Sequence, residues 1–311
     1  MNAVKSSTAT GTTATAESAA PCRGRFAPSP TGPLHQGSLL AALASWLDAR
    51  ARSGAWLIRM EDLDAPRVVS GAADGILATL ARLGLESDEP VLLQSTRGAA
   101  YRAALRSLAS RGLTYRCACS RSEIQGVYDG HCRDLNITDP DAAWRLRMDP
   151  GGAIAFEDRI QGHVEYQVAA LGDPVLMRRD GLVAYQLAVV VDDAFQGITD
   201  VVRGADLLES TAWQIMLARA LELPVPAYAH VPLLTEPDGA KLAKSRRSVS
   251  VVDAEPAALL VSTLALLGQK PHPDLKAAPV SDILHWAVQH WSPQAVAGIR
   301  AVQLPARSEL A

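Results

Sequence analysis

The stretch GRFAPSPTGPLHQGS, residues 24–38, most constrains what this chain can fold into. It contains three prolines, three glycines and a lone histidine. Each proline fixes φ and removes a backbone donor, so neither a strand nor a helix can run through them. Beyond the stretch, one helical face carries Leu39, Leu40, Leu43 and Leu47, and Gly54 offers a stop. The pattern predicts a strand over 23–27, a stiff loop and then a helix.

Strands and helices continue to alternate along the next part of the chain. AWLIRME at 55–61 reads as a buried strand, helices are expected over about 70–83 and 98–111, and LTYRC at 113–117 reads as another strand. This alternation is typical of an α/β fold with a parallel sheet, in which ligands sit beyond the carboxyl ends of the strands. The loop at 27–38 would lie there.

The pattern changes between residues 113 and 180, where cysteines, turns and short strand candidates at 144–148 and 153–156 suggest an insertion. Residues 175–193 carry two β-rich runs around Arg-Asp-Gly, which favours a hairpin. A strand at 198–206, a helix at about 210–221 and a strand before a Pro-Asp-Gly turn follow. Amphipathic helices are expected near 254–268, 279–290 and 293–303.

Composition excludes some classes of protein. The 311 residues have a formal net charge of −3 and a pI of about 6.2, so the whole molecule is not an electrostatic trap for nucleic acid, and any RNA must be held by local patches. No apolar run is long enough for a signal peptide or a membrane span. We expect a flexible tail at 1–21 on a cytoplasmic protein without membrane association.

Two loops have the chemistry of a phosphate site. Backbone N–H groups at the start of a helix favour anions, and His35 would lie at that start. KLAKS, residues 241–245, places two lysines and a serine on a turn after a strand, where they could grip a triphosphate. Taken singly, His35 could be a satisfied structural residue, and KLAKS could be a solvated basic loop.

Taken together, RFAPSPTGPLHQGS and KLAKS resemble the two ATP-binding motifs of class I aminoacyl-tRNA synthetases, the first in its glutamyl-type form. The resemblance extends through RMEDLD (59–64), YQLAVVVDD (185–193) and VVRGADLLES (201–210), and spans about residues 23–268. It implies a Rossmann-like doubly wound parallel sheet. Departures are a Gly-Ser ending where many relatives have a second histidine, and Leu242 and Ala243 where Met and Ser are usual.

Residues 246–311 are too few for the anticodon-binding region of a full glutamyl-tRNA synthetase. The chain is therefore similar to a truncated branch of the family that activates L-glutamate with ATP and Mg²⁺, then esterifies it onto queuosine in the anticodon loop of tRNA(Asp). The alternatives are a shortened glutamyl-tRNA synthetase that charges a tRNA 3′ end, and a non-catalytic paralogue that binds glutamate or ATP.

The resemblance also implies site residues. His35 and Lys244 would be the catalytic pair that holds the phosphates. The glutamate pocket would be formed by Arg25, Phe26, Ala27, Pro28, Ser29, Glu61, Tyr185 and Arg203. ATP would contact His35, Gly37, Ser38, Lys241, Lys244 and Ser245. Without the resemblance, Glu61 and Asp62 would read as a helix-capping or salt-bridging pair, and Arg203 as a surface strand residue.

Cys117, Cys119 and Cys132 offer three thiolates to a structural Zn²⁺, which takes four ligands in a tetrahedron. Chemistry alone favours His131 as the fourth ligand, although its adjacency to Cys132 makes joint ligation awkward. The family uses a tyrosine at the position of Tyr128, so the resemblance implies Tyr128. The alternative is three reduced, partly buried thiols without a metal.

For RNA, the candidate contacts are Arg178 and Arg179 near the expected hairpin, and Arg246 and Arg247 after the lysine motif. We expect a monomer. The predicted organisation is a tail at 1–21, a first half of the catalytic domain at 22–112, a zinc-bearing insertion at 113–180, a second half at 181–250 and a short helical region at 251–311.

Overall fold

A computed structural model describes residues 21–120, 122–235 and 251–304. Seven strands form the main sheet, in the order β3-β2-β1-β9-β10-β6-β7. The strands of this sheet are β1 (Arg23–Phe26), β2 (Ala55–Met60), β3 (Leu92–Leu93), β6 (Ala153–Asp158), β7 (Gly162–Gln167), β9 (Asp200–Gly204) and β10 (Ala227–Val231). All neighbours are parallel except the β6–β7 pair. The expected parallel sheet is confirmed, with one antiparallel edge.

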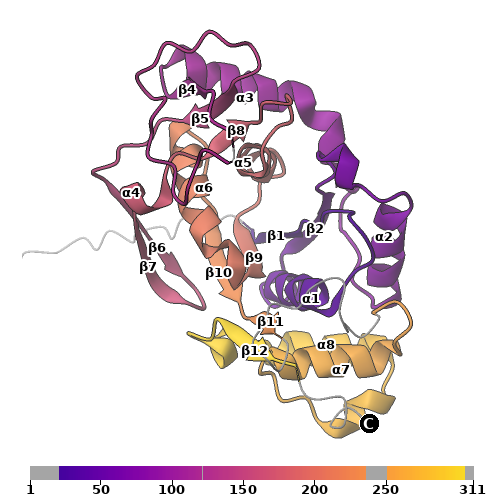
Figure 1. Cartoon of the computed structure of the whole chain (residues 1–311). Coiled ribbons are helices and arrows are strands. Elements are labelled where there is room, and N and C mark those ends of the chain that lie inside the picture. The colour runs from indigo at the N-terminus through magenta and orange to yellow at the C-terminus, as the bar shows by residue number, and fades with distance from the viewer. Residues whose placement is uncertain (1–20, 121, 236–250, 305–311) are drawn as a thin grey trace, which may run out of the picture.

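Eight α-helices surround the sheets in the described part of the chain (Figure 1). They are α1 (Gln36–Arg50), α2 (Ala72–Arg82), α3 (Gly98–Ser110), α4 (Val168–Leu171), α5 (Tyr185–Phe195), α6 (Leu208–Ala220), α7 (Pro256–Leu266) and α8 (Val280–His290). Short 3-10 turns lie at Ala65–Arg67, Gln94–Arg97, Ala205–Leu207, Pro273–Ala277 and Pro293–Val296.

The main sheet is covered on both faces because its strands are apolar at consecutive positions. Ile58 and Val202 pack in the core cluster that contains α1, whereas the residues before them, Leu57 and Val201, pack with Ile215 of α6. Successive side chains of a strand point to opposite faces, so α1 and α6 lie on opposite sides of the sheet. This is the expected doubly wound arrangement.

Helix α1 is buried on most of its surface. Leu39, Leu40, Leu43 and Leu47 are at most 1% exposed, because α1 lies between the sheet and the α7–α8 pair (Figure 1). His35 is its N-cap, and the His35 Nδ1 accepts a hydrogen bond from the Ser38 N–H at 3.1 Å. The helix therefore begins directly after the proline-rich loop, as the sequence predicts.

Two expectations from the sequence are wrong. The run at 185–193 is the helix α5, not the second strand of a hairpin; only a turn and an isolated Met177–Val183 bridge follow β8 (Val175–Met177). Both faces of α5 are buried, so tertiary packing overrides the β-propensity of its valines. The expected helix at 293–303 is a 3-10 turn followed by β12 (Ala301–Gln303), which pairs in parallel with β11 (Leu233–Thr235).

The segment from 113 to 180 contributes to two sheets. The small antiparallel sheet contains β4 (Thr114–Cys117), β5 (Ala143–Leu146) and β8, and it lies beside α3 in Figure 1. The β6–β7 hairpin instead joins the edge of the main sheet through Asp158 and Tyr228. None of the helices in the described ranges has the length and apolar character that a membrane span needs.

Candidate active site

One cavity of about 870 Å³ opens at the carboxyl ends of the parallel strands. Its wall contains residues from the end of β1, the loop before α1, the residue after β2, the start of α5 and the end of β9. The cavity brings together every described residue of the two predicted ligand sites: Arg25, Phe26, Ala27, Pro28, Ser29, His35, Gly37, Ser38, Glu61, Tyr185 and Arg203. Ligands in open α/β sheets bind at this edge.

Arg25 is held at the cavity by a buried ion pair. Its Nε and Nη2 donate to the two carboxylate oxygens of Asp193 at 3.2 and 3.3 Å. Arg59, which is fully buried in β2, donates from Nη1 to the same Asp193 at 2.7 Å. Burial alone would raise the pKa of Asp193, but Arg25 and Arg59 together hold it below the ordinary value. Asp193 is therefore an ionised anchor that orients two guanidinium groups.

Glu61 follows β2 directly and lines the same cavity. Its Oε1 lies 3.8 Å from Arg59 Nη2 and has no hydrogen-bond partner among the residues that the structure describes. Burial raises the pKa of Glu61 to about 7, against the opposing charges of Arg59 and Arg25. A carboxylate in this position is suited to accept a hydrogen bond from a ligand ammonium group.

Arg203 is 5% exposed and lies near the end of β9. Its Nη1 donates to the Tyr185 hydroxyl at 3.2 Å, and its Nη2 donates to the Thr211 hydroxyl at 2.7 Å and the Leu207 carbonyl at 3.3 Å. Arg203 is therefore a buried residue of the cavity wall, and the reading of it as a surface strand residue is wrong. Its Nε donates to His230 Nε2 at 3.2 Å.

The loop between β1 and α1 forms another part of the wall. Gly32 has a φ of +145°, a conformation that L side chains rarely adopt. A Cβ on Gly37 would lie 3.3 Å from the His35 ring, so glycine permits the close approach of the helix start to the imidazole. The Ser38 hydroxyl lies 2.9 Å from His35 Nε2. His35, Gly37 and Ser38 thus share one corner of the cavity.

Several residues that support the site were missed by the sequence reasoning. Arg59, Asp192, Asp193 and His230 are all at least 93% buried. The available signal was a charge inside an apolar run, as in WLIRME and VVVDD, because a buried charge requires a partner. Asp62, by contrast, accepts hydrogen bonds from the N–H and hydroxyl of Ser95, which fits the capping role considered for it and not a place in the cavity.

Of the arginines considered for RNA, Arg178 lines the cavity and pairs with Asp64 and Asp180. Arg179 donates to the Ala118 carbonyl and reaches Asp139. Lys241, Lys244, Ser245, Arg246 and Arg247 lie outside the described residues, so the structure does not test the second ATP motif.

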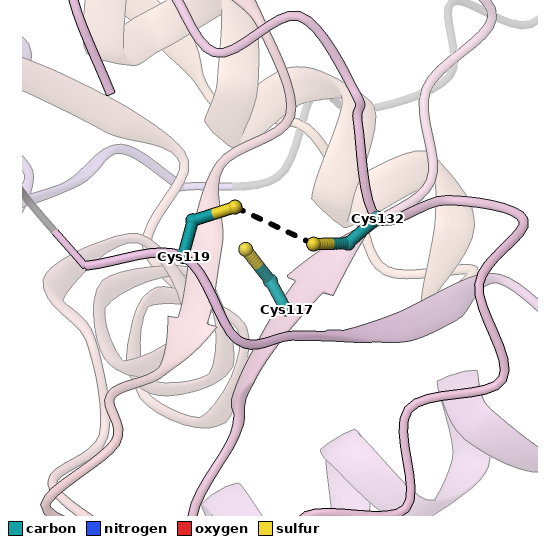
Figure 2. A group of neighbouring side chains, drawn as sticks. All are labelled: Cys117, Cys119 and Cys132. Carbon is teal, nitrogen blue, oxygen red and sulfur yellow. Dashed lines mark hydrogen bonds between the residues drawn. The ribbon is translucent and has the colours of Figure 1, made fainter. Parts of the chain in front are cut away.

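A second site is the cysteine cluster after β4. The sulfur atoms of Cys117, Cys119 and Cys132 all lie within 4.8 Å of one another, and the distance between Cys119 Sγ and Cys132 Sγ is 3.4 Å. Figure 2 shows the three side chains pointing toward one another. The Tyr128 hydroxyl lies 3.5 Å from Cys117 Sγ and accepts a hydrogen bond from the Cys132 N–H at 2.9 Å. Tyr128 therefore completes a compact group of four side chains, whereas His131 is exposed.

The surroundings of the cluster shift the pKa values of its thiols in opposite directions. Burial and the neighbouring thiols raise the pKa of Cys119 to about 12. Burial would raise the pKa of Cys117, but hydrogen bonds from Tyr128 and Arg145 lower it below the ordinary value of a thiol. The Arg145 guanidinium also stacks 3.8 Å above the Tyr128 ring. Structural zinc is held by four side-chain ligands, and the three converging cysteine sulfur atoms with the Tyr128 hydroxyl beside them fit such a site.

Comparison with known proteins places this geometry in a family. Residues 21–278 match the family model of the class I tRNA synthetases (E and Q), catalytic domain. The chain belongs to this family and is an aminoacyl-tRNA ligase.

Within the family it groups with the glutamyl-Q tRNA(Asp) synthetases. The protein of that name from Pseudomonas aeruginosa is 53% identical over 272 residues, which cover 86% of this chain and 92% of that protein. The one from Serratia proteamaculans is 50% identical over 285 residues, covering 90% and 94%.

Solved structures agree on the fold. A glutamate-tRNA synthetase from Elizabethkingia anophelis superposes with a TM-score of 0.78 at 23% identity, covering 93% of this chain and 69% of that one. A glutamate tRNA ligase from Elizabethkingia meningosepticum in complex with its amino acid gives a TM-score of 0.77 at 24% identity, covering 92% and 67%.

Proposed function

We propose that this chain activates L-glutamate with ATP and transfers the glutamyl group to queuosine in the anticodon loop of tRNA(Asp). The observation that carries the proposal is the single cavity in which Arg25, Arg203 and Glu61 lie beside the loop of His35. Glutamate carries two carboxylates and one ammonium, so it needs two guanidinium groups and an acid. The proposed RNA substrate is inferred from the names of relatives that are 50–53% identical to this chain.

In the first step, a carboxylate oxygen of glutamate forms a bond to the α-phosphorus of ATP, and the bond to pyrophosphate breaks. In the second, a hydroxyl of queuosine attacks the acyl carbon of glutamyl-adenylate, loses its proton and releases AMP. Positioning and charge stabilisation provide most of the acceleration, and an acyl adenylate is reactive without a strong base. Mg²⁺ bound to the phosphates would offset their charge.

Each group of residues has a proposed part in these steps. Arg25 and Arg203 bind the carboxylates, Glu61 binds the ammonium, and Tyr185 orients Arg203 through its hydroxyl; the backbone from Phe26 to Ser29 lines the pocket. His35, Gly37 and Ser38 receive the phosphates at the start of α1, where backbone N–H groups and the helix dipole favour anions. Lys244 is the proposed second catalytic residue, with Lys241 and Ser245 beside it.

Zinc, if bound, would be held by Cys117, Cys119, Tyr128 and Cys132, and would supply only structural cross-linking of a turn-rich segment. This segment has few apolar contacts of its own: its core cluster contains mainly the four ligand side chains and Tyr115. We further propose that the protein acts as a monomer in the cytoplasm, where its tRNA is found.

The experiment has two stages. Glutamate-dependent exchange of pyrophosphate into ATP is measured first, without any tRNA. Radiolabelled glutamate is then transferred to tRNA(Asp), and the label is located by nuclease digestion, with queuosine-lacking tRNA as the control. We expect exchange without tRNA and label in the anticodon loop only when queuosine is present. Label on the terminal adenosine would instead identify a shortened glutamyl-tRNA synthetase, and absence of exchange would contradict the first step.

A further inference from the structure

His230 lies behind Arg203, one layer further from the cavity. It belongs to β10, is fully buried and is absent from the cavity wall. Its Nδ1 lies 2.5 Å from the Asp158 carboxylate, and its Nε2 lies 3.2 Å from Arg203 Nε and 3.0 Å from the Thr211 hydroxyl. A carboxylate, an imidazole and a guanidinium thus form a chain that runs from β6 through β10 to β9.

The geometry fixes the tautomer of His230. Hydrogen bonds from His230 and two backbone N–H groups outweigh burial and lower the pKa of Asp158, so this group is a carboxylate and Nδ1 must carry the proton that it accepts. Burial and the charge of Arg203 lower the pKa of His230 to about 4, against the opposing effect of Asp158. The imidazole is therefore neutral. Its Nε2 accepts from the Arg203 Nε–H, while the nearby Thr211 hydroxyl can direct its own hydrogen to the Leu207 carbonyl at 3.1 Å.

The hydrogen bond to His230 is one of four that hold the Arg203 guanidinium. A guanidinium has five N–H donors. Its Nε–H is directed to His230, and its two Nη2 hydrogens to the Thr211 hydroxyl and the Leu207 carbonyl. One Nη1 hydrogen is directed to the Tyr185 hydroxyl. Within the described ranges, one hydrogen, on Nη1, is left at the cavity.

We infer that His230 is a positioning residue for the amino-acid site: held by Asp158, it accepts from Arg203 Nε and fixes the guanidinium plane so that Nη1 is presented to a carboxylate of the substrate. This inference rests on the proposed function, which assigns Arg203 to glutamate. His230 never touches the ligand. The Tyr228 ring lies next to His230 on β10, nearly parallel to it at a centroid distance of 6.2 Å.

Two substitutions of His230 distinguish the effect of its hydrogen-bond acceptor, Nε2, from the effect of the size of its ring. His230→Phe keeps a planar ring but removes both nitrogens. His230→Gln places an amide oxygen and nitrogen about as far apart as the two ring nitrogens, so it can accept from Arg203 and donate to Asp158. We expect His230→Phe to raise the KM for glutamate roughly tenfold to a hundredfold in pyrophosphate exchange, with the KM for ATP unchanged. His230→Gln should stay within about threefold of the parent protein.

Further variants show whether a negative result contradicts the role of Arg203 or the role of His230. His285→Phe, on the exposed face of α8, makes the same change of residue away from the site and should leave both KM values unaltered. If Arg203→Ala leaves the KM for glutamate unaltered, the assignment of Arg203 in the proposed function is wrong. If Arg203→Ala raises it but folded His230→Phe does not, the positioning inference is overturned. Equal rises in both KM values for His230→Phe would also overturn it.

A measurement on the unmodified chain tests the tautomer that the inference requires, even if His230→Phe does not fold. Nitrogen-15 NMR of the histidine side chains at pH 7.5, with His230 assigned by the signal missing from His230→Gln, reports which ring nitrogen carries hydrogen. We expect a neutral ring protonated at Nδ1. Protonation at Nε2 would leave no acceptor for Arg203 and would overturn the inference.

Discussion

The charges around each acidic residue at the cavity determine what that residue can do. Arg25 and Arg59 both donate to the carboxylate of Asp193. Their positive charges offset the negative charge of Asp193, so Asp193 does not repel an incoming anion. Among the residues that the structure describes, Glu61 has no comparable partner: its Oε1 is 3.8 Å from Arg59, and burial raises its pKa to about 7. The two acids therefore have different parts, one as an anchor and one as a group available to a ligand.

The raised pKa of Glu61 predicts how glutamate binding depends on pH. Only the carboxylate accepts from an ammonium, so protonation below about pH 7 should weaken binding, and the affinity should rise with pH and level off above that value. Both carboxyl groups of free glutamate are largely ionised throughout this range. Titration calorimetry between pH 5.5 and 8 measures the effect.

Glu61→Gln is the control for this prediction. The amide does not titrate, so the variant should bind glutamate roughly tenfold or more weakly at pH 8 and show a flat profile. A parent protein whose affinity is constant from pH 5.5 to 8 would contradict the role of Glu61.

At the scale of elements, the start of α1 combines a helix cap with a proposed phosphate site. His35 accepts from the Ser38 N–H as the N-cap. The same imidazole lines the cavity. A change at this position therefore affects helix stability and ligand binding together unless the variant retains the cap.

His35→Asn separates the two effects because asparagine is among the best N-cap residues. We expect it to keep the unfolding free energy within about 0.5 kcal/mol of the parent, whereas His35→Ala should lose about 1 kcal/mol. Both should lower the rate of pyrophosphate exchange at saturating glutamate by roughly tenfold or more, because both lack the imidazole donor. Chemical denaturation and exchange assays measure these quantities, and full exchange by His35→Asn would show that the cap is all that His35 provides.

The cysteine cluster is the second element that can be tested alone. Cys132→Ser removes one proposed zinc ligand and should reduce the zinc content, measured by mass spectrometry after dialysis, from one ion per chain to roughly a tenth or less. Cys22→Ser is the matched control, since Cys22 is a buried cysteine far from the cluster in sequence and absent from it in space. A parent protein that takes up no zinc when supplied with it would contradict the proposed metal.

At the scale of the whole molecule, one buried carboxylate of α1 contacts residues from distant parts of the chain. Asp48, 4% exposed, pairs with Arg52 of the following turn and with Arg159 of the β6–β7 turn. The Trp291 indole, which follows α8, donates to Asp48 at 3.4 Å. These contacts fasten the hairpin and the C-terminal helices to the helix that carries His35.

Asp48→Asn should therefore lower the unfolding free energy by about 2 kcal/mol, because it removes one of the two carboxylates that Arg52 and Arg159 share; the other, Asp200, stays in place. The expected value is at the low end for a buried pair, since Arg52 and Arg159 are 38% and 29% exposed. Urea denaturation measures it. Glu89→Gln, which breaks the exposed pair with Arg23, is the control and should change stability by less than about 0.5 kcal/mol. Equal effects of the two variants would show that the Asp48 contacts do not stabilise the assembly of these parts.

The sequence by itself determined the local elements and the proline-rich loop before α1. Proline, glycine and capping residues act on the φ and ψ of their own neighbours, so β1, the loop at 27–38 and the start of α1 could be predicted from one short stretch. The same reasoning failed at α5 and β12. There the burial of both faces of a helix, and a pairing with β11, decided the conformation against local preference.

Only the tertiary structure decided which charges meet. Arg25 and Asp193 are 168 residues apart, and Arg203 and His230 are 27 apart, yet each pair is in contact inside the protein. Sequence patterns report the spacing of residues along one element, whereas the first contact depends on where α5 lies relative to β1, and the second on the pairing of β9 with β10. The physical reason is that a buried charge is tolerated only beside a partner, and the partner is supplied by whichever strand or helix the fold brings next to it.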